Sequence, residues 1–363
     1  MMNTFNLEIL DVNDLDRKEI TYDYDLSELS NCVCLDPLRR MELDWDGQVR
    51  TCCAMWTNYV IGNWKVNTLQ EIWEGARAEH FRSSVIKDKT FKYCNAFNCD
   101  QLAKKEFDMD RSERLDDYLK GKKINIETLH FNVDDSCQLS CPSCRVSVRY
   151  HRDIFKTNPE YLTIANEVID LFDNGYIERL YLTGGGDPFY NESCEYLMDK
   201  IKGTQKSHLI LHTNGLGFTK NWWESHTNLH RMVHWITISI DAGNKKSYDK
   251  VRRGGNWDKL LENLNFIASL GIVVTLNIVI QSDNYESFPE LIDLTKKLND
   301  SGTSTFDIFA SKIMKWDAIP DDEFKAKAVW DEKHPDYKNF RKIMKTDTKG
   351  LYVNFGSLLQ HFN

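Results

Sequence analysis

Three cysteines in one short run constrain this chain more than any other feature. Cys137, Cys141 and Cys144 form a C-x3-C-x2-C pattern. Three such thiolates can hold three corners of a [4Fe–4S] cluster, which normally takes four, so one iron stays open to a non-protein ligand. Zinc sites favour paired C-x2-C half-sites or added histidines, and disulfide frameworks suit small secreted chains. The run predicts iron–sulfur chemistry, with zinc or unrelated thiols as the alternatives.

The bulk composition narrows the class of protein. A length of 363 residues allows one large domain and a smaller one. The net charge of −9 argues against a dedicated nucleic-acid binder, which usually shows a basic face. No apolar stretch approaches the roughly 20 residues that span a bilayer, and Met1 to Asp16 has no secretory pattern. Ten cysteines without a signal indicate a reducing compartment, so we expect a cytoplasmic protein without membrane partners.

Strand-like and helical segments alternate from about Ile126 onward. Strands are expected at 126–133, 177–183, 208–212, 235–240, 272–280 and 305–309. Helices are expected at 161–172, 192–201, 257–270 and 288–298, where apolar residues recur at helical spacing. Six strands alternating with helices predict a parallel α/β sheet with right-handed crossovers. The cysteine run directly follows the first strand, and the loops after the strands form the active face of such folds.

A glycine-rich turn supports a family resemblance. Thr183-Gly184-Gly185-Gly186-Asp187-Pro188 follows the second strand. Alone, it indicates a tight turn, and it lacks the Gly-Lys-Ser/Thr of a phosphate loop. After the cysteine run, it resembles the G-G-E-P segment of the radical SAM superfamily, whose backbone receives the amino group of S-adenosylmethionine (SAM). The open iron of the cluster would hold SAM there.

Three further segments are similar to SAM contacts of that family. Ser239, in Ser239-Ile240-Asp241-Ala242-Gly243, is the candidate ribose contact, and Arg252 the candidate carboxylate partner or a solvated helix charge. Asn277, with Asn284, matches a looser adenosine position, and Thr213-Asn214-Gly215 resembles a T-N-G motif. The resemblance implies a cofactor-binding set of Gly184, Gly185, Gly186, Asp187, Asn214, Ser239, Arg252 and Asn277.

The N-terminal cysteines carry a second resemblance. The segment from Cys34 to Cys99 includes an Asp46-Gly47 hairpin turn and Cys52-Cys53, and it resembles the SPASM/Twitch auxiliary-cluster motif. The resemblance implies a second [4Fe–4S] cluster held by Cys34, Cys52, Cys94 and Cys99, with Cys53 able to replace Cys52 and Cys32 spare. A structural zinc knot built from the same cysteines is the alternative. Cys194 stands alone in a helical pattern, and we interpret it as an inert core thiol.

These resemblances imply a fold and a domain order. The fold class is α/β: a partial (β/α)6 TIM-like barrel of parallel strands with a small N-terminal α+β auxiliary-cluster domain. We expect an N-terminal tail at 1–30, the auxiliary domain at 31–100, a charged linker at 101–125, the barrel at 126–312 and a helical C-terminal extension at 313–363. The auxiliary motif precedes the barrel here, whereas in many members of the family it follows.

The implied activity is radical chemistry. Cys137, Cys141 and Cys144 would hold the catalytic cluster, which would cleave SAM reductively to a 5′-deoxyadenosyl radical that abstracts a hydrogen from the substrate. The main expectation is a peptide substrate, as in the maturation of ribosomally made peptides, with the auxiliary cluster aiding oxidation. The alternatives are a dehydrogenase or isomerase acting on a small molecule or modified nucleoside, and a non-catalytic iron–sulfur electron carrier. An electron donor such as flavodoxin or ferredoxin is the expected partner. The sequence leaves open the net reaction, the oligomeric state and the role of the auxiliary cluster.

Overall fold

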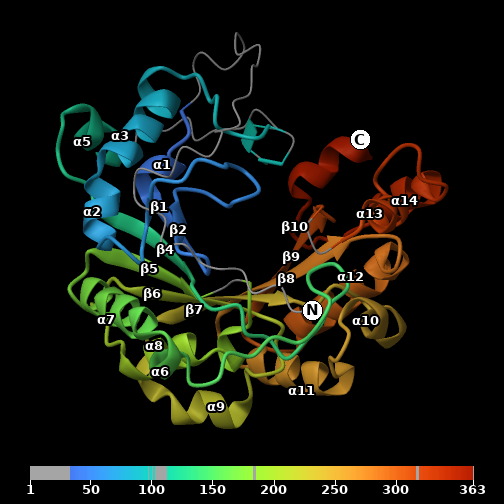
Figure 1. The fold of residues 1–363 in the computed structure, drawn as a ribbon. Coiled ribbons are helices and arrows are strands. Elements are labelled where there is room, and N and C mark those ends of the chain that lie inside the picture. Colours follow the sequence, from blue (N-terminus) through green and yellow to red (C-terminus); the bar gives the residue numbers. More distant parts are fainter. Residues whose placement is uncertain are drawn as a thin grey trace, which may run out of the picture. The chain divides into compact units, whose positions relative to one another are not determined.

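The computed structural model describes residues 33–96, 98–99, 101–102, 113–182, 185–315 and 319–362. The chain divides into two compact units, with the boundary between Ile126 and Glu127 (Figure 1). Each unit has its own buried aromatic side chains, such as Trp73 in the first and Phe172 in the second. The expected tail at 1–30, Cys32, Gly184 and positions 103–112 of the expected linker lie outside the described residues.

The first unit contains a small antiparallel sheet. Its strands are β1 (Arg40–Asp44), β2 (Gln48–Arg50) and β3 (Gly62–Asn63), with β2 between the other two. The Asp46-Gly47 turn joins β1 to β2 as the sequence predicts. Gly47 has φ +97°, and an added Cβ would lie 2.6 Å from Asn63 Oδ1. Both the backbone conformation and the close approach therefore require glycine at this position.

Short helices complete the first unit. They are α1 (Asp36–Arg39), α2 (Leu69–Glu74), α3 (Ala76–Arg82), a π-helical turn η3 (Ser83–Lys87) and α5 (Glu113–Leu119). Thr68 and Glu71 form a capping box at the start of α2, which satisfies two backbone N–H groups. The buried side chains of Leu69, Ile72 and Trp73 then anchor this helix in the core.

The second unit contains a sheet whose strands follow one another in chain order. They are β4 (Ile126–Asn132), β5 (Ile177–Leu182), β6 (His208–Thr213), β7 (Val233–Ser239), β8 (Val273–Ile280), β9 (Thr305–Lys312) and β10 (Val353–Asn354). Every pairing from β5 to β10 is parallel. The six predicted strands are confirmed, and the parallel α/β arrangement is that of a partial barrel. The two-residue β10 has no counterpart in the sequence-based expectation.

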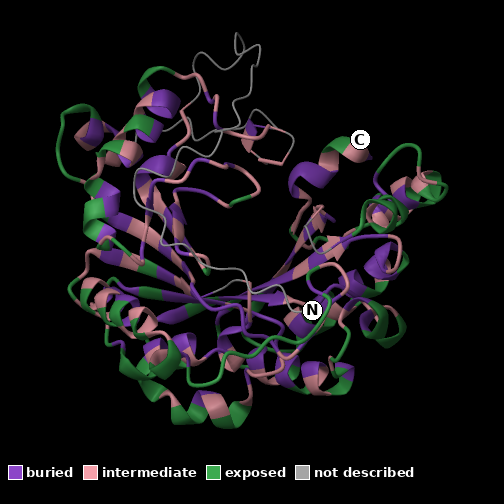
Figure 2. Cartoon of the chain, viewed as in Figure 1, coloured by how far each residue is buried: buried purple, intermediate pink, exposed green. Residues whose placement is uncertain are grey.

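Helices cover one face of this sheet (Figure 1). They include α7 (Pro159–Asp173), α8 (Glu192–Lys200), α9 (Lys220–Ser225), α11 (Trp257–Ile267) and α12 (Phe288–Ser301). Alternate strand residues such as Leu209 and Leu211 are fully buried. His212, of the opposite parity, is only partly buried, as are Asn277 on β8 and Ser311 on β9. Buried and partly buried residues are both present along these strands (Figure 2). The face without these helices therefore carries the polar strand residues.

The remaining elements of the second unit are short. They are α6 (Ile154–Thr157), η4 (Pro188–Tyr190), η5 (Thr227–Leu229), α10 (Lys245–Val251), η6 (Tyr285–Ser287), α13 (Asp321–Lys327), α14 (Tyr337–Met344) and η7 (Gly356–His361). The C-terminal segment thus contains the expected helices, together with β10. No helix among the described residues is long and apolar enough to cross a bilayer.

Candidate active site

The three-cysteine run forms a loop directly after β4. Cys137 and Cys141 are buried, whereas Cys144 is exposed. The loop is closed by backbone hydrogen bonds in both directions between Cys137 and Arg149, and Cys144 N donates to Cys141 O at 2.9 Å. Leu139 is buried between the first two cysteines and packs with Leu216. This local packing fixes the backbone that carries the three thiols.

Two guanidinium groups lie beside these thiols. Arg252 Nη1 donates to Cys141 Sγ at 3.6 Å, and the buried Arg145 donates to the Asp135 carbonyl at 2.7 Å. Burial raises the pKa of the Cys137 thiol to about 11. Burial also raises the pKa of Cys141, while Arg252 opposes that rise. Positive charge near the sulfurs favours the thiolate forms that metal ligation requires.

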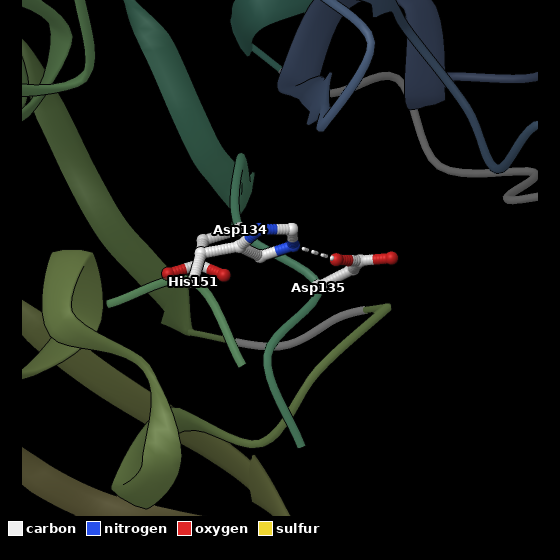
Figure 3. A group of neighbouring side chains, drawn as sticks. All are labelled: Asp134, Asp135 and His151. Carbon is white, nitrogen blue, oxygen red and sulfur yellow. Dashed lines mark hydrogen bonds and ion pairs between the residues drawn. The ribbon is translucent and has the colours of Figure 1, made fainter. Parts of the chain in front are cut away.

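A carboxylate pair and a histidine lie at the base of the loop. Asp134, Asp135 and His151 have potential ligand atoms within 4.8 Å of one another (Figure 3). His151 Nε2 lies 2.6 Å from Asp135 Oδ1, and Arg149 pairs with the other oxygen. Asp135 already interacts with both His151 and Arg149. We therefore infer that these residues stabilise the conformation of the cysteine loop. Neither Asp134 nor Asp135 was predicted from the sequence.

The glycine-rich turn packs directly on this loop. An added Cβ on Gly186 would lie 2.3 Å from the Ser136 carbonyl oxygen and 3.0 Å from that of Asp134. Asp187 N donates to the same Ser136 carbonyl at 2.8 Å. Gly185 N donates to Asn132 Oδ1 at 2.5 Å. Glycine is therefore required at 186 so that the turn can approach the backbone before Cys137.

Asp187 links the ends of β5 and β6. Its Oδ2 accepts hydrogen bonds from Thr213 Oγ1 at 2.9 Å and from Asn214 N at 2.7 Å, and Oδ1 accepts from Phe189 N at 3.1 Å. Burial raises the pKa of Asp187, and these bonds oppose the rise. The carboxylate is thus occupied by protein partners, which hold Asn214 in place.

Near the cysteine loop, Asn214 uses its amide oxygen in hydrogen bonds but leaves its amide nitrogen without a partner among the described residues. Its Oδ1 accepts from Gln138 Nε2 at 3.3 Å and from Leu216 N at 3.0 Å. Its buried Nδ2 has no hydrogen-bond partner among the described residues. Because buried polar groups are normally satisfied, an orphaned donor at this place fits a site that receives a polar ligand.

A buried ion pair organises the end of β7. Asp241 Oδ2 lies 3.0 Å from Arg252 Nε, and Asp241 Oδ1 accepts from Val279 N at 2.7 Å. Burial would lower the pKa of Arg252, but Asp241 and Cys141 raise it overall. Asn284 donates to the carbonyls of Asp241 and Val279, so its amide is used within this turn. Arg252 therefore stays charged beside the cysteine loop.

Ser239 and Asn277 meet around His212, a residue that the sequence analysis did not single out. Ser239 Oγ lies 2.9 Å from His212 Nε2, and Asn277 Nδ2 lies 3.5 Å from the same nitrogen. The buried Asn277 Oδ1 has no hydrogen-bond partner among the described residues. The position of His212 immediately before Thr213-Asn214-Gly215 was the available signal.

The first unit gathers a second set of cysteines. Cys34, Cys52, Cys94 and Cys99 line one cavity of about 370 Å³, a volume that includes its opening to solvent. Apolar side chains such as Phe81, Phe91 and Leu102 line the same cavity. Cys53 is absent from this lining, and burial, with the nearby Glu42 carboxylate, raises the pKa of its thiol. The structure therefore groups Cys52, and not Cys53, with the other three cysteines.

The donor set of this cavity fits an iron–sulfur cluster. Four cysteine thiols and apolar side chains line the same cavity. Four thiolates are the usual ligands of a [4Fe–4S] cluster.

Comparison with known proteins agrees with this geometry. Residues 131–295 match the family model of the radical SAM superfamily, and residues 34–100 match the SPASM model, an iron–sulfur cluster-binding domain. Residues 131–295 are thus similar to radical SAM domains, and residues 34–100 to SPASM domains. The first similarity implies a SAM-binding [4Fe–4S] cluster, and the second implies an auxiliary iron–sulfur cluster. The two matched segments contain the cysteine loop and the four-cysteine cavity, respectively.

Curated proteins similar to this chain include two enzymes named GTP 3',8-cyclase. The one from Peptoclostridium acidaminophilum is 29% identical over 192 residues, which cover 50% of this chain and 55% of that enzyme. The one from Rhizobium etli is 27% identical, covering 45% and 47%. The chain spans about half the length of these relatives. Among solved structures, coproporphyrinogen III oxidase from Escherichia coli aligns with a TM-score of 0.37 and 15% identity, covering 54% of this chain and 47% of that one.

Proposed function

We propose that the protein is a radical SAM enzyme. The observation that carries the proposal is the loop of Cys137, Cys141 and Cys144, which provides three thiols and lies beside the charged Arg252. Two orphaned amide atoms, Asn214 Nδ2 and Asn277 Oδ1, support a polar ligand at the ends of the neighbouring strands. When bound, the cluster and SAM would supply a one-electron reductive cleavage that yields a hydrogen-abstracting radical.

The residues of this chain have distinct roles in the proposal. The three loop cysteines bind the cluster, and the backbone of the glycine-rich turn receives the amino group of SAM. Arg252 binds the carboxylate of SAM as a charge-assisted partner, while Ser239, Asn277 and Asn214 orient the nucleoside. Asp187 and Asp241 position Asn214 and Arg252 through the hydrogen bonds and the ion pair that they make.

A small molecule is the better supported substrate class. A peptide was the main expectation from the sequence, but the relatives named GTP 3',8-cyclase favour the small-molecule or nucleoside alternative. We therefore propose a small polar substrate and a reaction of the oxidoreductase or isomerase type, with reduced flavodoxin or ferredoxin as the electron donor. The peptide hypothesis remains as the second candidate.

The four-cysteine cavity supports a role in electron transfer. Cys34, Cys52, Cys94 and Cys99 supply all four ligands of a [4Fe–4S] cluster from the protein. A fully ligated cluster has no open iron for a substrate. We therefore propose that the auxiliary cluster exchanges electrons and does not bind the substrate directly.

One measurement tests the proposed activity. The protein is reconstituted anaerobically and reduced, and 5′-deoxyadenosine formed from SAM is assayed by chromatography, with iron and sulfide counted in the same sample. We expect product and about eight irons per chain, as two four-iron clusters require. Full clusters without SAM binding would favour the non-catalytic electron carrier. Zinc without sulfide would contradict both.

A further inference from the structure

A chain of hydrogen-bonding groups crosses three strands next to the proposed SAM site. Tyr181 on β5 donates its hydroxyl proton to Thr237 Oγ1 on β7 at 3.4 Å. The same Tyr181 oxygen lies 3.4 Å from Nδ1 of His212 on β6. The other ring nitrogen, Nε2, lies 2.9 Å from Ser239 Oγ. His212 therefore connects the Tyr181 hydroxyl to the serine proposed to contact SAM.

The protonation state of His212 follows from its surroundings. Burial, with the nearby Arg252 charge, lowers the pKa of His212 to about 4, so the ring is neutral at pH 7. A neutral imidazole has one donor and one acceptor nitrogen. With the Tyr181 hydroxyl donating to Thr237 Oγ1, its oxygen is oriented to accept from His212, and we assign the imidazole proton to Nδ1 on this geometry. Nε2 is then the acceptor.

An acceptor at Nε2 determines how its two neighbours point. Ser239 donates its hydroxyl proton to Nε2, which leaves the lone pairs of Ser239 Oγ free. Asn277 also turns its Nδ2 toward Nε2, at 3.5 Å. Its Oδ1 is consequently directed away, where it has no partner among the described residues. The result is two hydrogen-bond acceptors, one from β7 and one from β8, at residues paired across the two strands.

We propose that His212 is a positioning residue for SAM: as the Nδ1–H tautomer, it makes Ser239 and Asn277 present acceptors to the two hydroxyl donors of the SAM ribose. A vicinal diol offers two O–H donors, which two acceptors complement. This inference rests on the proposed function, because it assigns the ligand of the same site. It predicts selectivity for the ribose hydroxyls, a property that a merely structural histidine would not confer.

The test measures binding, not turnover. Dissociation constants for SAM and its 2′-deoxy and 3′-deoxy analogues are determined by calorimetry on anaerobically reconstituted protein. For the wild type, we expect each missing hydroxyl to weaken binding about tenfold, as for one well-placed hydrogen bond. His212→Leu should weaken SAM about tenfold and leave at least one deoxy analogue unchanged within about twofold, because the lost interaction is coupled to a hydroxyl.

Matched variants keep the test decisive. His212→Gln retains an acceptor and should recover much of the preference for SAM. Tyr181→Phe keeps the histidine but removes the oxygen that fixes the proton on Nδ1. It should therefore reduce the preference for SAM over its deoxy analogues, and it provides a test even if His212→Leu does not fold. Thr275→Val removes a hydroxyl that accepts from Trp235 Nε1 on the same sheet and should change nothing. Equal weakening of SAM and both analogues by the His212 variants would overturn the inference. A wild type that binds SAM without discriminating the analogues would also overturn it, whereas a wild type that binds no SAM would overturn the proposed function as well.

Discussion

Asp241 shows how much depends on one side chain beside the cysteine loop. It is buried, pairs with Arg252 and accepts a hydrogen bond from Val279 N. Its φ of +55° lies in the left-handed region, which Asn and Asp tolerate better than other side chains. Asn at this position would therefore keep the backbone conformation and one acceptor while removing the charge.

The first prediction concerns this charge. Asp241→Asn should lower the free energy of unfolding by about 3 kcal/mol, because it leaves the buried Arg252 without its counter-charge. Denaturant unfolding under anaerobic conditions measures the change. Asp249→Asn is the matched control, since Asp249 pairs with Lys245 on the exposed surface of α10 and should matter far less. Equal losses in the two variants would contradict the importance of the buried pair.

His212 makes a second prediction, on pH dependence. Its folded-state pKa of about 4 is below the usual 6.5, so the unfolded state binds a proton first as the pH falls. The contribution of His212 is thus full above about pH 6.5 and is lost as the pH falls toward 4, a loss of about 3 kcal/mol. Unfolding free energies of the wild type and His212→Gln across this range measure it. Parallel curves for the two proteins would refute the assignment.

Residue types and spacing predicted the cysteines but not their supporting contacts. Cys137, Cys141 and Cys144 stand out by local spacing alone. Asp135 acts through Arg149 and His151, which lie 14 and 16 positions away in the sequence. The choice of Cys52 over Cys53 depends on which way adjacent side chains point in an irregular turn. Such pairings are set by tertiary structure, so no local pattern reveals them.

Among the elements, the turn after β5 shows how packing restricts sequence. Gly186→Ala would place a methyl group 2.3 Å from the Ser136 carbonyl oxygen, so the turn or the cysteine loop must shift. We expect a loss of about 1–3 kcal/mol in unfolding free energy, as for other overpacked sites. SAM affinity should fall as well, because the turn and the cluster loop move apart.

A control for this third prediction separates the effect of backbone strain from the effect of displacing the turn. Gly121→Ala introduces a left-handed alanine with φ +73°, but its Cβ would meet no atom within 4 Å. It should cost some stability and leave the affinity for SAM unchanged. Calorimetric titration of both variants decides the question, and unchanged SAM binding in Gly186→Ala would show that the turn does not position the ligand.

Strands and helices of the second unit were predictable because their periods are regular. Buried residues recur at helical spacing in α11, where Leu260, Leu264 and Ile267 face the core. β8 is an almost continuous apolar run, as a central parallel strand should be. The two-residue β10 and the π-helical turn η3 have no such period. Both elements depend on pairing and packing with distant segments, so the local sequence does not predict them.

At the scale of the whole molecule, the two cysteine sets belong to different compact units. The four-cysteine cavity lies within residues 34–102, and the three-cysteine loop follows β4. Every cysteine that lines the cavity comes from the first unit. Metal loading of the two sites should therefore be separable by mutation, even though one chain carries both.

The last prediction uses adjacent cysteines as a matched pair. Cys52→Ala removes a thiol that lines the cavity, so iron should fall from about eight to about four per chain, while the affinity for SAM stays within about twofold. Cys53→Ala should leave both values at the wild-type level, because its thiol does not line the cavity. Iron analysis and calorimetry on anaerobically reconstituted protein give both numbers. Equal iron loss in the two variants would contradict the ligand set, and loss of SAM binding in Cys52→Ala would show that the two sites depend on each other.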